Sequence, residues 1–155
     1  MKLVKSPDPW LEKVVKEFDF DALDAKSIAQ GMINLMTAEG GIGLSANQVA
    51  LDAQILVMKP HLLENKEPFA MINPVIESVT INMENMPEGC LSFPGLILSV
   101  KRPRGIIVKY LDIDSKECII ELYDLDARCF CSYIRRIGCI SDYQITGTCF
   151  GKFRR

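Results

Sequence analysis

The chain has 155 residues, of which 48% are apolar and 25% charged, and its formal net charge is −2. This length favours one domain, 1–155, with a core that needs no disulfide scaffold. The weak net charge gives no reason to expect nucleic acid or an anionic membrane as a partner, and no apolar run approaches the roughly 20 residues that span a bilayer. The N-terminus lacks the apolar core of a secretory signal, so the chain is expected to be cytoplasmic, with reduced thiols. It is also expected to be a monomer.

Residues 7–11 predict a turn that leads into a short helix, which Asp8 can cap. Apolar side chains at spacings of three and four predict a longer helix over residues 21–37, and the glycines that follow end it. A buried strand is expected from Gln54 to Met58.

Short β-rich runs separated by turns fill the middle of the chain, at residues 71–80, 96–100, 106–113 and 117–123. Residues 125–137 then predict a second helix. Because the helices and strands are segregated along the chain, the order predicts an α+β fold in which small, mainly antiparallel sheets surround a C-terminal helix.

The first segment with chemical potential reads Gly41-Ile42-Gly43-Leu44-Ser45-Ala46-Asn47-Gln48. Two glycines indicate close backbone approach, and the bend that they allow presents Gln48. A glutamine amide can donate to a developing oxyanion without taking part in proton transfer. The structural alternative is a helix C-cap followed by a buried bend.

The second segment reads Glu88-Gly89-Cys90-Leu91-Ser92-Phe93-Pro94-Gly95. Cys90 could serve as a thiolate metal ligand or as a nucleophile, and the backbone N–H of Leu91 could point at the same space. The structural alternative is a buried cysteine at a strand end, since free cysteine is among the most buried residue types.

Together the two segments resemble the first two signature motifs of peptide deformylases, a Gly-x-Gly-Leu-small-Ala-x-Gln segment and a later Glu-Gly-Cys-Leu-Ser. The resemblance runs in order over about residues 1–130. It extends to Lys5-Ser6-Pro7-Asp8-Pro9-Trp10-Leu11, Ile72-Asn73-Pro74-Val75-Ile76 and Val100-Lys101-Arg102-Pro103.

The resemblance implies a metal hydrolase that removes the formyl group from formyl-methionyl nascent peptides at the ribosome. Its metal, iron(II) or zinc, is held by one cysteine and two histidines, with water in the open position. On this chain Cys90 matches the cysteine ligand. The other matched residues have three further roles in the family. Gln48 and the Leu91 amide hold the formyl oxygen, Ile42, Gly43 and Leu44 form the edge along which substrate lies, and Glu88 pairs with Arg102 to brace the cysteine loop.

The third motif of the family, His-Glu-x-x-His on a helix, is absent. Ser132 and Arg136 fill the histidine places and Tyr133 fills the glutamate place. The one histidine of the chain, His61, lies in a polar loop, where a solvated surface role is expected. Because one cysteine is too small a ligand set for a tight metal site and no general base is evident, we expect no appreciable turnover.

Two explanations fit the change of character near residue 130. Residues 1–130 hold 13 basic and 19 acidic side chains, whereas residues 131–155 hold 5 and 1. This shift favours a change of reading frame, and the alternative is a genuine non-catalytic relative. Adjacent arginines at 135 and 136 are hard to bury, so the helix is expected to fray past about residue 137.

Two functions outside catalysis stay open. The chain could be a module that binds formyl-methionyl peptides through Gln48 and the edge at residues 42–44. It could instead hold structural zinc through its late cysteines, although their spacing does not match common zinc knuckles. These cysteines are Cys129, Cys131, Cys139 and Cys149.

Overall fold

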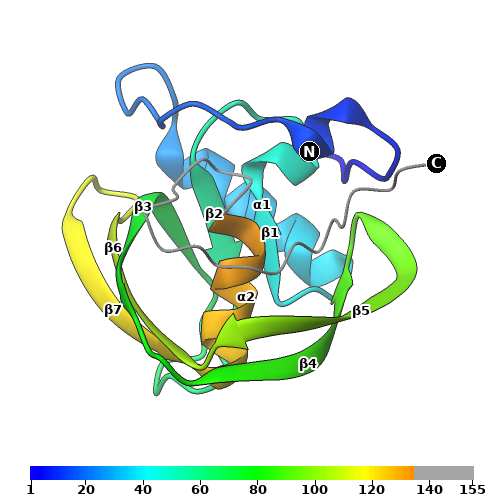
Figure 1. The fold of residues 1–155 in the computed structure, drawn as a ribbon. Coiled ribbons are helices and arrows are strands. Elements are labelled where there is room, and N and C mark those ends of the chain that lie inside the picture. The colour runs from blue at the N-terminus through cyan, green and yellow to red at the C-terminus, as the bar shows by residue number, and fades with distance from the viewer. Residues whose placement is uncertain (135–155) are drawn as a thin grey trace.

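The structure is a computed structural model that describes residues 1–134. Its elements are η1 (Pro9–Glu12), α1 (Ala25–Ala38), β1 (Gly43–Ser45), η2 (Ala46–Val49), β2 (Ile55–Met58), β3 (Phe69–Val79), β4 (Met83–Cys90), β5 (Phe93–Pro103), β6 (Gly105–Leu111), β7 (Glu117–Tyr123) and α2 (Asp124–Ile134) (Figure 1). The predicted α+β class, with antiparallel sheets and a C-terminal helix, is confirmed. The fraying expected past residue 137 lies outside the described residues.

The strands form a five-stranded antiparallel sheet of order β1-β2-β3-β6-β7 and a separate hairpin of β4 and β5. Strand β2 lies inside the larger sheet, and all four of its residues are buried. Ile55 and Val57 pack in the apolar cluster around α1, whereas Leu56 and Met58 pack in the cluster around α2. Because successive side chains point to opposite faces of a strand, the two helices cover opposite faces of the sheet.

Helix α2 also contacts the β4–β5 hairpin through β5, so it lies between the sheet and the hairpin (Figure 1). Phe130 is fully buried in the cluster around this helix. No helix within residues 1–134 is long and apolar enough to cross a membrane.

Helix α1 ends where the first motif begins. Asp24 caps its start by accepting a hydrogen bond from the Ser27 N–H at 3.1 Å. At its other end Gly40 has a φ of +69°, and the N–H of Gly41 donates to the Met36 carbonyl at 2.9 Å. A left-handed glycine with this bond closes a helix and turns the chain, and here it directs the chain into β1.

Several elements differ in extent from the sequence expectation, among them β5, which was expected over residues 96–100 and spans Phe93–Pro103. The helix predicted from residue 21 begins at Ala25, because Asp24 caps the helix and residues 20–23 form turns. Strand β4 was not expected, since its sequence contains Pro87 and lacks a continuous apolar face. It forms because it pairs along its length with β5, from Met83 with Pro103 to Cys90 with Phe93.

Candidate functional site

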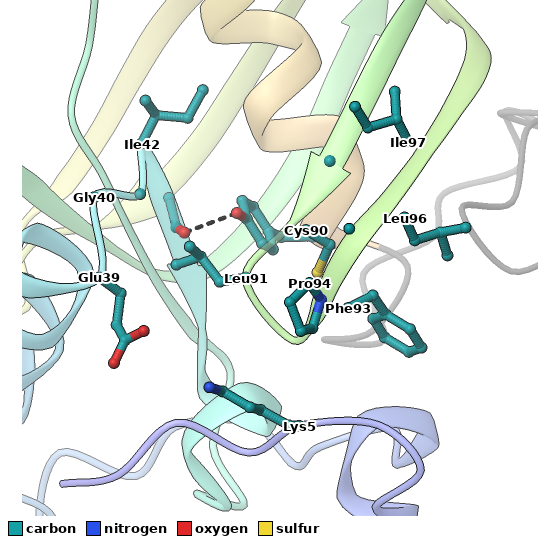
Figure 2. Close-up of a pocket in the computed structure, with 15 residues that line it drawn as sticks. Lys5, Glu39, Gly40, Ile42, Cys90, Leu91, Phe93, Pro94, Leu96 and Ile97 are labelled. Carbon is teal, nitrogen blue, oxygen red and sulfur yellow. Dashed lines mark hydrogen bonds between the residues drawn. The ribbon is translucent and has the colours of Figure 1, made fainter.

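A groove of about 530 Å³ separates the segment entering β1 from the end of the β4–β5 hairpin. Figure 2 shows Glu39, Gly40 and Ile42 on one side, Cys90 and Pro94 on the other, and Lys5 at one end. The two motifs identified in the sequence therefore meet across one cavity. Its lining comprises Lys5, Glu39, Gly40, Gly41, Ile42, Gly43, Gly89, Cys90, Leu91, Phe93, Pro94, Gly95, Leu96, Ile97 and Tyr133.

Gln48 lies beside the cysteine loop and is fully buried. Its side-chain oxygen accepts hydrogen bonds from the N–H and the hydroxyl of Ser45, each at 3.0 Å. Its side-chain nitrogen donates to Ser92 Oγ at 3.0 Å and to Cys90 Sγ at 3.7 Å. These bonds fix the amide so that its N–H₂ group faces Cys90. Leu91 is the next residue in the chain.

Strand β1 is an edge strand of the larger sheet. The Ile42 carbonyl accepts the N–H of Lys59, just beyond β2, at 2.9 Å, and Leu44 lies opposite Val57 of β2. Alternate residues of a strand direct their backbone polar groups to opposite sides. The polar backbone groups of Gly43 therefore face away from β2, on the side of the groove.

Glu88 forms the centre of a buried ionic cluster. Arg102 donates to both carboxylate oxygens, each at 2.8 Å, and Arg128 donates to Oε1 at 2.7 Å. The exposed fractions of the three side chains are 8% for Glu88, 3% for Arg102 and 6% for Arg128. The paired Glu88 and Arg102 expected from the resemblance are thus side by side, and a second arginine joins them.

The arginines also connect the elements around the cysteine. Arg102 donates to the Cys131 carbonyl of α2 at 3.2 Å, and Arg128 donates to the carbonyls of Val100 and Glu84 at 2.8 and 2.7 Å. Burial alone would raise the pKa of Glu88, but hydrogen bonds and charge from the two arginines outweigh it and hold that pKa below its usual value. The carboxylate therefore stays charged and links α2 to both strands of the hairpin.

Three residues of the site make contacts that were not predicted from the sequence. They are Arg128, Ser92 and Tyr133. Arg128 sits among apolar helix residues, which is a signal that a buried guanidinium has a partner. Ser92 is fully buried next to Leu91. The contact of Tyr133 has no local signal, because it joins residues 90 positions apart.

The donor atoms near Cys90 do not fit the metal that the resemblance implies. Among residues 1–134 no group of three His, Cys, Asp or Glu side chains could hold a metal ion. At the matched helix positions, the Ser132 hydroxyl donates to the Cys129 carbonyl and the Tyr133 hydroxyl donates to the Gly43 carbonyl, both at 2.7 Å. Both are neutral hydroxyls engaged with backbone, in place of the imidazoles that bind such metals. Arg136 lies outside the described residues.

His61 does not line the groove. Its side chain is 40% exposed, as expected for a surface loop. The loop is nonetheless anchored, because the N–H groups of His61 and Leu62 donate to the buried carboxylate of Asp126 at 2.8 and 2.9 Å.

Cys129 and Cys131 are both buried in the cluster around α2. Burial raises the pKa of both thiols, that of Cys131 to about 12, which disfavours the thiolate that zinc binds. Residues two apart on a helix also point in different directions. Their placement does not favour the zinc site, which stays a prediction because Cys139 and Cys149 lie outside the described residues.

Close packing around β1 gives a testable expectation for Gly43. A Cβ at this position would lie 2.5 Å from Tyr133 Cε2 and 2.7 Å from Cys129 Sγ. We expect Gly43→Ala to lower the free energy of unfolding by about 1–3 kcal/mol through overpacking. Chemical denaturation of Gly89→Ala is the matched control, because a Cβ there would meet only the Leu96 carbonyl, at 3.9 Å. Equal stability of the two variants would contradict the packing described here.

In a comparison with known protein families, the model of the family described as polypeptide deformylase matches residues 1–134. Peptide deformylase 1B of Arabidopsis thaliana is 36% identical over 132 residues, which cover 84% of this chain and 48% of the relative. The peptide deformylase of Borreliella burgdorferi is 34% identical over 130 residues, which cover 83% of this chain and 76% of the relative. The chain spans about half the length of this Arabidopsis relative and of peptide deformylase 1B of Oryza sativa.

Solved structures agree with the sequence comparison. The deformylase of the Vibrio parahaemolyticus bacteriophage VP16T, determined in complex with actinonin, is 32% identical with a TM-score of 0.81, and the match covers 91% of this chain and 99% of that one. The Thermotoga maritima peptide deformylase is 30% identical with a TM-score of 0.78, covering 90% and 92% of the two chains. With the family model matching residues 1–134, these likenesses show that the chain belongs to the polypeptide deformylase family.

Proposed function

We propose that this member of the family binds N-formyl-methionyl peptides along the edge of β1 without hydrolysing them at an appreciable rate. The observation that carries the proposal is that Cys90 and Gly43 of β1 line one groove, with the buried Gln48 amide against Cys90, and that hydroxyls stand at the helix positions matched to metal ligands. Cytoplasmic location and a monomeric state stay predictions, and one matched plant relative is described as chloroplastic or mitochondrial.

The binding half of this proposal rests on backbone geometry. An extended peptide can add to an exposed sheet edge through main-chain hydrogen bonds. Strand β1 is an edge strand, although Gly43 is buried and its outward carbonyl accepts the Tyr133 hydroxyl, and the groove beside it has the volume of an ordinary small-ligand site. A formyl oxygen would accept from the Leu91 backbone N–H and from the Gln48 side-chain nitrogen in place of the latter's contact with Cys90 Sγ, whereas a free ammonium has no oxygen to accept either bond.

The non-catalytic half rests on the residues of α2. Hydrolysis of an amide needs an activated water and a group that moves its proton. Ser132 and Tyr133 supply neither a metal-binding imidazole nor a carboxylate. The Glu88 carboxylate, which faces α2, is bonded to two arginines, and its lowered pKa makes it a weak base.

Fluorescence anisotropy with a labelled N-formyl-Met tripeptide tests the binding half. We expect the formylated peptide to bind at least about tenfold more tightly than the same peptide with a free amino terminus, because one good hydrogen bond and the rejected ammonium together reach that ratio. A formylated peptide with N-methylated backbone amides is the matched control for strand addition and should bind more weakly. Equal affinity for the formylated and free peptides, or no binding of either, would contradict the proposal.

A further inference from the structure

Tyr133 occupies the position at which the family resemblance places a glutamate, in the last turn of α2. Its side chain is nearly buried, with 9% of the residue exposed. Its hydroxyl donates to the Gly43 carbonyl at 2.7 Å, the bond drawn as a dashed line in Figure 2. Tyr133 lines the groove and therefore reaches from α2 to the edge strand β1 within it.

The accepting carbonyl is one that an added strand would use. Ile42 and Leu44 face β2, so Gly43 presents its carbonyl on the outer side of β1. A peptide N–H that adds to this edge would need the position now held by the Tyr133 hydroxyl. The phenol thus makes, within the protein, the hydrogen bond that the edge would offer to a ligand.

The tyrosine ring adds a steric obstacle to this bond. A Cβ built at Gly43 would lie 2.5 Å from Cε2 and 3.2 Å from Cζ of the ring, so the ring lies directly against this residue. A second pocket of about 160 Å³ lies on the α2 side and shares Ile42, Gly89 and Tyr133 with the groove. Withdrawal of this side chain would extend the groove toward that second pocket.

We propose that Tyr133 is an intramolecular competitor for the edge of β1, so that a peptide gains full strand pairing at Gly43 only when the phenol leaves the carbonyl. The inference rests on the proposed peptide binding and adds a residue that weakens it. Tyr133 acts because its hydroxyl occupies the Gly43 carbonyl, and this competition involves no chemical step.

The test compares peptide affinity of the wild type, Tyr133→Phe and Tyr133→Leu by anisotropy with the N-formyl-Met tripeptide. Tyr133→Phe removes the bond to Gly43, and we expect its affinity to rise about three- to tenfold, the range of one hydrogen bond. Tyr133→Leu also removes the ring and should bind at least as tightly as Tyr133→Phe. Tyr123→Phe is the matched control, because its hydroxyl bonds to Glu121 on exposed β7 and it does not line the groove, so its affinity should equal that of the wild type.

A second measurement follows the bond itself without peptide. The ¹³C carbonyl resonance of Gly43 should shift upfield in Tyr133→Phe and stay unchanged in Tyr123→Phe, since a carbonyl loses an acceptor bond only in the first variant. An unchanged Gly43 resonance would overturn the inference. Wild-type binding that neither Tyr133 variant improves would overturn it while leaving the proposed function intact. Failure of all three chains to bind peptide would overturn the proposed function, and the inference with it.

Discussion

Purified protein supplied with iron(II) or nickel(II) is expected to release formate from an N-formyl-Met peptide at least about a hundredfold more slowly than an ordinary deformylase. Loss of a general base alone typically costs about 10²–10⁴-fold in rate. This chain has Tyr133 at the matched position, and that hydroxyl is engaged with the Gly43 carbonyl. Loss of the two imidazoles removes the metal-activated water as well.

A coupled formate assay, run beside an active deformylase, measures this difference. The matched variant carries Ser132→His, Tyr133→Glu and Arg136→His together, which restores the family residues at three positions of the sequence. We expect this variant to bind more metal than the wild type, as measured by elemental analysis after gel filtration. Wild-type turnover within about a hundredfold of the active enzyme, abolished by Cys90→Ser, would contradict the expectation and imply ligands other than those matched here.

Much of the frame around the groove could be predicted from local sequence. The spacing of Met32 and Met36 predicted α1, and both side chains are fully buried in its cluster. The glycines at 41 and 43 indicated close approach, and a Cβ at either position would meet another side chain at 2.6 Å or less. In each case the signal is local, because periodicity and missing side chains report on the same few residues.

The contacts that assemble the site could not be predicted in this way. Gln48 reaches Cys90 across 42 residues, and Arg128 reaches Glu88 across 40. Strand β4 was missed because its pairing with β5 gives it a regular form that its own composition does not favour. Family resemblance supplied the pairing of Glu88 with Arg102, but Arg128 belongs to the same cluster and became evident only in the folded chain.

The ionic cluster around Glu88 gives the second large expected effect. We expect Glu88→Gln to lower the free energy of unfolding by about 3–5 kcal/mol, because removing one partner of a buried charge cluster leaves uncompensated charge in the interior. Glu84→Gln on the same strand is the matched control. Its carboxylate is 45% exposed and lies 3.8 Å from Arg104, so its loss should change stability by about 0.5 kcal/mol or less. Urea denaturation at neutral pH separates the two variants, and equal losses would show that the cluster does not stabilise the fold.

The same cluster predicts how stability depends on pH. The pKa of Glu88 is lowered in the folded protein, whereas in the unfolded chain it has the ordinary glutamate value of about 4.3. As pH falls from neutral, Glu88 is therefore protonated in the unfolded chain before it is protonated in the folded protein. The stabilisation from this carboxylate is therefore complete above that value, and it is lost as pH falls through the lower pKa of the folded state. The stability difference between wild type and Glu88→Gln should shrink over this acidic range, whereas that for Glu84→Gln should stay small throughout. A difference for Glu88→Gln that stays constant down to about pH 3 would mean that the carboxylate stabilises the hairpin and α2 through packing instead of charge.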